Sequence, residues 1–296
     1  TEALKDPELA GVVAGHYASA AEADPTNVEL VKKARDATIA SAERAAELGS
    51  ELQAVALYRQ AISLSNDLSE MADLKLKMAT RLEKSGREDL AEESAQEAMD
   101  FFRSVDDDGG VMRAATVLAD VYAGNFEAAK AVEIVLPVYE STAKSETTDW
   151  ARLAGQTSRA LMLGDQHDRA IEVGDDAIPI LERLDMSDGL LDILISKATS
   201  LTVTGRWTEG VALFRGVTDI ARERGFLNAE VRSTNNLVAA TQNDSLLTEL
   251  YEVMDRLITK SGQIGWRIRV LFFGALDAYS SGEIKEALAK VEEAEQ

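Results

Sequence analysis

The sequence predicts an all-α fold built from repeated helical hairpins. Six glycines each separate two helical patterns and precede a small residue by five or six positions. These glycines are 37, 38, 40, 41 and 77 residues apart, and the last interval hides one degenerate unit. A period near 39 that persists along the chain is typical of a helical-repeat array. The six pairs are Gly49 and Ala54, Gly86 and Ala91, Gly124 and Ala129, Gly164 and Ala170, Gly205 and Gly210, and Gly282 and Ala287.

The composition supports the same fold class. Hydrophobic residues make up 46 % of the chain, which argues against disorder. With 4 prolines and 5 % aromatic residues among abundant Ala, Leu and Glu, the chain favours helices that pack closely through small side chains. No stretch shows the alternating pattern of a strand together with hairpin turn residues.

Local start and stop signals give the element boundaries. A leading helix is expected over 8–24, before Pro25. Thr26 and Glu29 then form a capping-box pattern, and Ser50 begins a second one after Gly49. Glycine ends a helix readily because it adopts the left-handed conformation without a steric penalty.

The same pattern of helix, turn and helix recurs seven times. The sixth hairpin turns at Asn243-Asp244, where asparagine can replace glycine. The small residue after each turn lets the two helices of a hairpin approach closely, and larger residues such as Tyr58 and Phe214 fill the space between hairpins. We therefore expect one array over 1–296, with hairpins at 27–65, 69–103, 111–143, 149–184, 188–224, 226–260 and 266–295.

This pattern resembles the tetratricopeptide repeat (TPR). The resemblance lies in Gly49, Ala54 and Tyr58, and again in Gly205 and Gly210 with their flanking residues. It implies a right-handed superhelical solenoid of about seven antiparallel hairpins, in which the first helix of each hairpin lines an inner groove. The spacing exceeds the usual 34 residues, which implies longer helices or loops.

The chain also resembles the C-terminal TPR region of bacterial regulatory ATPases, of the LuxR-type or nucleotide-cyclase-linked kind. That resemblance lies in the opening segment with Leu9, Ala14, His16 and Tyr17. It implies a non-catalytic scaffold that binds a protein or peptide, as the sensing or partner-binding region of a larger regulator. Since the sequence begins at Thr1 and its last residues still follow a helical pattern, we expect it to be part of a longer protein. The partner could then be an attached domain of the same parent chain.

Charge and cysteine content exclude several classes of partner. The formal net charge is −21, and residues 1–190 account for −18 of it, so no nucleic-acid partner is expected. The acid either solubilises an outer face or lines a groove for a basic partner. No apolar run is long enough for a membrane span, so no membrane partner is expected. The absence of cysteine fits a reducing compartment, and a cytoplasmic location is expected.

No motif for catalysis or cofactor binding is present. The Gly205–Gly210 segment has a spacing similar to a phosphate-binding loop, but Val211 follows where lysine is required. The acidic run that begins at Asp106 lacks the glutamate of a calcium loop. His16 and His167 lie 151 residues apart and have no ligand motif. We therefore predict no catalytic residues, no metal, no cofactor and no enzyme activity.

The candidate binding residues lie on the expected inner face. Adjacent asparagines can hydrogen-bond an extended peptide backbone, and an arginine can hold a carboxylate. The alternative is that one asparagine bridges helices while the other is solvated, and that the phenylalanine packs in a core. A stand-alone scaffold that self-associates is the alternative function. The candidate partner-binding residues are Thr199, Arg232, Asn235, Asn236, Arg269 and Phe272, and the weaker inner-face candidates include Asp36, Ile39, Glu43, Asp73, Leu76, Thr80, Asp192, Ile195 and Leu276.

Overall fold

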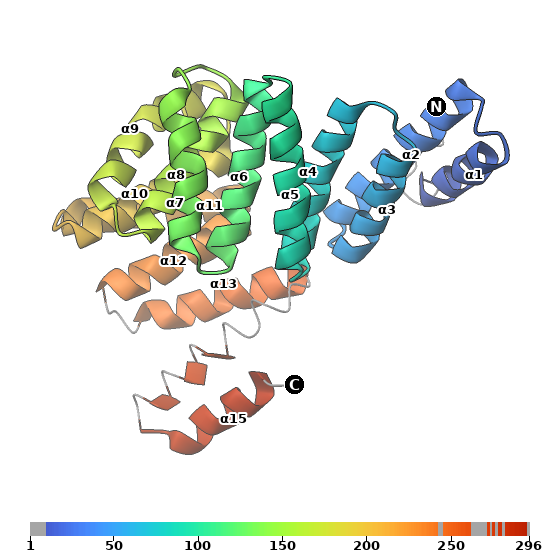
Figure 1. Cartoon of the computed structure of the whole chain (residues 1–296). Helices are drawn as coiled ribbons and strands as arrows, with labels where there is room; N and C mark the ends of the chain where they lie inside the picture. Colours follow the sequence, from blue (N-terminus) through green and yellow to red (C-terminus); the bar gives the residue numbers. More distant parts are fainter. Residues whose placement is uncertain are drawn as a thin grey trace. The chain divides into compact units, whose positions relative to one another are not determined.

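A computed structural model describes residues 10–241, 245–261 and 271–294, the last range without 273, 276, 277, 280 and 281. All regular elements in these ranges are α-helices, as Figure 1 shows. The helices are α1 (Ala10–Ala23), α2 (Val28–Glu47), α3 (Glu51–Ser63), α4 (Leu68–Lys84), α5 (Glu88–Ser104), α6 (Asp108–Gly124), α7 (Ala128–Ser141), α8 (Thr148–Leu163), α9 (His167–Arg183), α10 (Ser187–Val203), α11 (Trp207–Arg224), α12 (Leu227–Thr241), α13 (Ser245–Ser261) and α15 (Ile284–Ala294).

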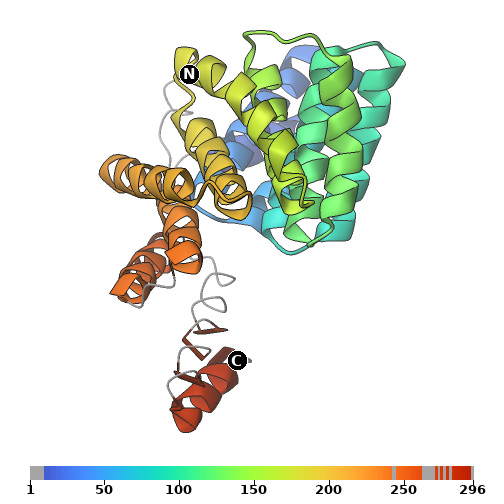
Figure 2. The same ribbon diagram turned by 90° about the vertical axis from the view of Figure 1, so that its left-hand side faces the viewer.

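The helices form two compact units, Thr1–Asp185 and Met186–Gln296. Within each unit, helices that follow one another pack together as antiparallel hairpins, such as α4 with α5, α8 with α9 and α10 with α11. Figures 1 and 2 show α5 to α8 standing side by side in the first unit. The all-α, TPR-like fold is therefore confirmed. The single array over 1–296 stays a prediction.

The capping-box predictions are wrong in detail. Asn27 caps α2, because its Oδ1 accepts a hydrogen bond of 3.1 Å from the backbone N–H of Leu30. Thr26 instead donates its hydroxyl to Asp24 at 2.9 Å. Ser50 precedes α3 without a side-chain cap bond. Asparagine is as good a cap as threonine, so the helix begins one residue later than the capping-box pattern indicates.

A left-handed residue, rather than a glycine, marks each described turn within a hairpin. The residue after it donates its N–H to the carbonyl five residues back, which is the Schellman closure of a helix. Glycine supplies the left-handed residue at Gly49, Gly86, Gly205 and Gly282, with φ between 70° and 87°. The closing bonds, donor first, are Ser50 to Ala45, Arg87 to Leu82, Glu127 to Tyr122, Gln166 to Leu161, Arg206 to Leu201 and Glu283 to Ala278, at 2.8 or 2.9 Å.

Two turns depart from the predicted register. In the α6–α7 turn the left-handed residue is Phe126 (φ 61°), two positions after Gly124. In the α8–α9 turn it is Asp165 (φ 59°), one position after Gly164. Counting five residues onward from them gives Ala131 and Ala170, both fully buried. The pairing of Gly124 with Ala129 is therefore wrong, since Ala129 is exposed. The late position of Ala170 after Gly164 has the same explanation.

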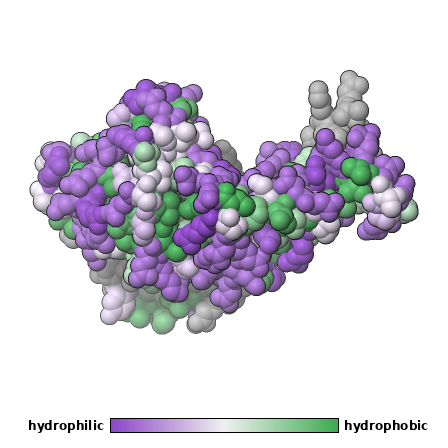
Figure 3. Space-filling view, turned by 45° about the horizontal axis from the view of Figure 1, so that its top comes forward, coloured by the Kyte–Doolittle hydropathy of each residue, from purple (hydrophilic) through white to green (hydrophobic). Residues whose placement is uncertain are grey.

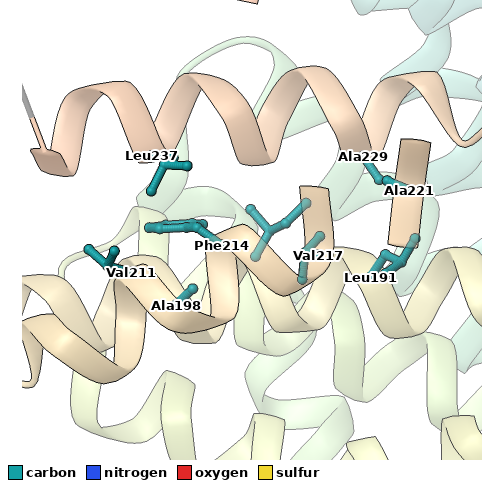
Figure 4. Packing of buried hydrophobic residues seen from close by; sticks show 9 residues of the cluster. Leu191, Ala198, Val211, Phe214, Val217, Ala221, Ala229 and Leu237 are labelled. Carbon is teal, nitrogen blue, oxygen red and sulfur yellow. The ribbon is translucent and has the colours of Figure 1, made fainter. Parts of the chain in front are cut away.

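The small residues allow close packing within hairpins, as predicted. A Cβ atom at Gly210 would lie 2.7 Å from the Ala198 carbonyl oxygen and 2.5 Å from the Thr202 Cγ2, so α10 and α11 nearly touch there. One turn later, Phe214 is 1 % exposed and belongs to one core cluster with Leu237 of the next hairpin. Figure 4 shows these two side chains between α11 and α12. Tyr58 fills the equivalent space beside Leu74 in the first unit.

Candidate functional site

The first helices of neighbouring hairpins lie against one another. Contacts join α4 to α6 and α6 to α8 in the first unit, and α10 to α12 in the second. Among the described helices, no two second helices are in comparable contact. The first helices therefore lie on the inner side of each unit, which is where the TPR resemblance places a binding face.

Four of the six predicted site residues come together on α10 and α12. Asn236 donates its Nδ2 to the hydroxyl of Thr199 at 3.1 Å, and Asn235 donates its Nδ2 to the Asn236 Oδ1 at 3.2 Å. Thr199 donates its own hydroxyl to the Ile195 carbonyl at 2.9 Å. All three polar side chains are half-buried. They form a hydrogen-bonded chain that crosses from one first helix to the next.

Arg232 already has a carboxylate partner. Its Nη1 lies 2.5 Å from the Asp192 Oδ1, one repeat earlier in the chain, and 26 % of its side chain is exposed. A partner carboxylate would have to displace Asp192 in order to bind this arginine. The sequence did not reveal this pair, because the two residues are 40 positions apart.

The remaining predicted residues have different outcomes. Phe272 is 56 % exposed, so it does not pack in a core. Arg269 and Leu276 lie outside the described residues. Two of the weaker inner-face candidates cannot contact a partner, since Leu76 is 5 % exposed and Ile195 is 0 % exposed.

The first unit carries an inner-face ladder, which we define as polar pairs that join first helices one repeat apart. Each pair spans 34 to 40 residues, close to the repeat period. Opposite charges at one period are the signal that could have predicted these pairs. The ladder consists of Arg35–Glu70 (3.1 Å), Lys77–Glu43 (2.6 Å), Arg113–Asp73 (3.0 Å), Arg113–Asp149 (2.9 Å), Arg159–Asp120 (2.7 Å) and Gln156–Asp120 (3.0 Å).

Electrostatics around the ladder are set by burial and by these pairs. Burial alone lowers the pKa of Arg113, but hydrogen bonds and charges from Asp149 and Asp73 outweigh it, so the pKa is raised. Burial, with a smaller contribution from Asp120, raises the pKa of the Glu83 carboxyl. The carboxylates of the ladder thus each have a cationic partner, so a basic ligand would have to compete with Arg35, Lys77, Arg113 or Arg159 for them. Figure 3 shows one face of the molecule, on which hydrophilic residues predominate.

Several arginines of the second unit are used for internal contacts. The Glu230 side chain is 1 % exposed and accepts from Arg222 at 2.9 Å and from Arg256 at 2.8 Å. Arg224 donates to the Ser187 hydroxyl at 2.8 Å. A buried carboxylate between two guanidinium groups fixes how α11, α12 and α13 pack, since leaving it unpaired would be costly.

The described residues contain no cluster of three or more His, Cys, Asp or Glu side chains that could hold a metal ion. None of the described helices is both long enough and apolar enough to cross a bilayer.

No family model matches the chain, and no curated protein matches it. Solved structures do match over most of its length. Aspartyl phosphate phosphatase F from Bacillus subtilis is 13 % identical, with a TM-score of 0.64 over 93 % of this chain and 73 % of that one. The Rap conjugation gene regulator of plasmid pLS20, solved with the Phr* peptide, is 9 % identical, with a TM-score of 0.62 over 90 % of this chain and 75 % of that one.

A third match is a multidomain protein. It is a signal transduction ATPase with numerous domains (STAND) and a tetratricopeptide repeat sensor, from Pyrococcus horikoshii. It is 10 % identical with a TM-score of 0.56, and the match covers 90 % of this chain but 43 % of that one. At such low identity these likenesses show a common fold, and the fold is the TPR-like array that the sequence predicts.

Proposed function

We propose that this chain is a non-catalytic TPR scaffold that binds a peptide or an extended protein segment on its inner face. The observation that carries the proposal is the half-buried chain of Thr199, Asn236 and Asn235 across α10 and α12. An asparagine amide has two N–H donors and an acceptor oxygen, and these bonds use only part of that capacity. The remaining donors and acceptors match the N–H and C=O groups of an extended backbone.

Two structural neighbours support this proposal by analogy. One Rap regulator was solved with a peptide, and the STAND protein carries its repeats as a sensor. A further neighbour is named a phosphatase, but the sequence of this chain has no glycine-rich phosphate-binding loop. The proposed role is therefore binding, with the repeats as the sensing region of a larger bacterial regulator.

The binding proposal is tested by affinity selection. Randomised hexapeptides, prepared with amidated and with free C-termini, are selected on the full 296-residue chain. Asn236→Ala should weaken binding of the selected peptides about tenfold, because one or two hydrogen bonds to the peptide backbone are lost. Gln53→Ala on α3 is the matched control, since Gln53 is an exposed amide on a second helix. Failure to select any peptide, or equal affinities for the two variants, would refute the proposal.

The sensing role needs a separate experiment. Native parent protein, captured from its source with an antibody against this chain, should have a mass two or three times the 32.0 kDa of the chain. A ligand shifts the activity of an attached module only if it binds the two states of that module with different affinity. A parent mass near 32 kDa would contradict this role.

One observation favours self-association as a second candidate function. On α15, Ile284, Leu288 and Val291 follow one another every three or four residues and are 49 %, 58 % and 47 % exposed. This spacing places them on one face of the helix. Light scattering tests the candidate: a chain that stays monomeric at high concentration rules it out.

A further inference from the structure

The inner face of α8 contains an arginine without a partner among the described residues. Arg152 is exposed, and no hydrogen bond or ion pair to its guanidinium is present. The charged groups on either side of it are occupied. Asp149 lies 2.9 Å from Arg113, and Arg159 lies 2.7 Å from Asp120. The ladder carboxylates here, Asp73 at 3.0 Å from Arg113 included, are paired with Arg113 or Arg159. Arg152 is therefore a positive charge that no carboxylate of the ladder neutralises.

A glycine opens the surface next to this arginine. Gly155 follows Arg152 by three residues and precedes Arg159 by four, so all three lie on one face of α8. A glycine inside a helix costs about 1 kcal/mol relative to alanine. A Cβ atom added at Gly155 would have no other atom within 4 Å, so packing does not require glycine here.

Comparison with other first helices shows what is missing at this position. Gly155 lies ten residues before the left-handed Asp165. The residues ten positions before Gly86 and Gly205 are Leu76 and Ile195, which are 5 % and 0 % exposed. The hairpins of α4 and α10 thus bury a large aliphatic side chain where α8 has open space above bare backbone. The corresponding residues of α2 and α6, Ile39 and Thr116, are half-buried. The open position at Gly155 lets a ligand backbone approach the helix closely.

We propose that Arg152 and Gly155 form a binding site for an extended peptide that carries a carboxylate. The guanidinium of Arg152 binds the carboxylate through paired N–H donors, and the peptide backbone lies against α8 at Gly155. This inference rests on the proposed peptide-binding function and adds a ligand class and a second position on the inner face. Because the chain has a net charge of −21, a peptide with one carboxylate fits better than one with an acidic run.

The hexapeptides selected above are the probe. Their sequences should be enriched in a single Asp or Glu, or in the free C-terminus, and comparison of the amidated and free-acid pools distinguishes these two sources of the carboxylate. Arg152→Gln should weaken binding of such peptides tenfold to hundredfold, because a charge-assisted bidentate contact is lost. The matched control is Arg59→Gln, an exposed arginine on the second helix α3, which should leave affinity unchanged. Replacing the peptide's Asp by Asn should produce the same loss, with no further loss in Arg152→Gln.

Gly155→Ala separates binding from folding. Alanine at this open helical position should raise the midpoint of urea unfolding, yet weaken peptide binding about tenfold by keeping the ligand backbone away. Gly216→Ala, an equally open glycine on α11, should raise the unfolding midpoint and leave affinity unchanged.

The outcomes distinguish this inference from the proposed function. Peptides that lose affinity with Asn236→Ala but not with Arg152→Gln would overturn the α8 site and leave the scaffold proposal standing. Selected peptides without any carboxylate would do the same. If no peptide is selected at all, both proposals fall.

Discussion

A close approach of α10 and α11 in the second unit predicts an unusual response to a single methyl group. Gly210→Ala places a Cβ atom 2.5 Å from the Thr202 Cγ2, 2.7 Å from the Ala198 carbonyl oxygen and 3.1 Å from the Thr202 backbone nitrogen. Two of these three atoms belong to the α10 backbone and cannot rotate away. The helices must therefore separate by several tenths of an ångström, and overpacking of this kind costs about 1–3 kcal/mol.

A second glycine in the same helix isolates the effect of this overlap. Gly216 of α11 is exposed, and an added Cβ atom there has nothing within 4 Å. Both substitutions gain about 1 kcal/mol of helix propensity, and both restrict the unfolded chain in the same way. Gly216→Ala should therefore stabilise the protein by up to about 1 kcal/mol, while Gly210→Ala should destabilise it by up to about 2 kcal/mol.

The assay is urea unfolding followed by far-ultraviolet circular dichroism on both variants and the parent sequence. The difference in unfolding free energy between the two variants should be about 1–3 kcal/mol, since the shared terms cancel. Variants of equal stability would show that α10 and α11 can move apart at no cost. The argument from close approach would then be refuted.

Three further stability predictions follow, each checked by urea unfolding. Phe126→Gly should stabilise the protein by about 1 kcal/mol, because it relieves a left-handed backbone at a side chain that is 89 % exposed; no gain would contradict this. Burial raises the pKa of the Glu83 carboxyl above its ordinary value of 4.5, so ionisation of this group opposes folding. The stability of the protein should therefore fall as the pH rises above 4.5. Glu83→Gln should accordingly stabilise the protein at pH 7 and have little effect at pH 4, and an equal effect at both would contradict the sign. Arg222→Gln should cost about 1–3 kcal/mol, since the buried Glu230 keeps Arg256 alone as its partner, and a loss below about 0.5 kcal/mol would show that one arginine suffices.

The hairpins could be predicted from sequence because their signals are local. The hairpin predicted at 69–103, for example, is observed as α4 (Leu68–Lys84) and α5 (Glu88–Ser104). Glycine and small residues recur at a fixed distance from each turn, and that distance is visible without knowing any contact. The register of the α6–α7 turn was not predictable in this way, because Phe126 adopts a conformation that its residue type disfavours.

The candidate site was predicted only in part because it depends on contacts between repeats. The sequence placed Thr199 and Asn236 on first helices, and the structure joins them by a hydrogen bond. The sequence did not indicate that Asp192 forms an ion pair with Arg232, since a pair of residues 40 positions apart depends on how the hairpins stack. For the same reason Ile195 was expected at the groove but is buried, because α12 packs against α10.

The inner-face ladder links the binding of a ligand in the groove to how strongly neighbouring hairpins are held together. Each of its pairs connects one hairpin to the next, and several of the paired side chains, such as Glu43 and Lys77, remain about half exposed. A ligand that takes one member of such a pair removes a connection between two hairpins while forming its own contact. By linkage, any force that separates those hairpins also strengthens binding of that ligand. In the first unit, a peptide bound to a ladder residue would therefore lower the resistance of the neighbouring hairpins to separation.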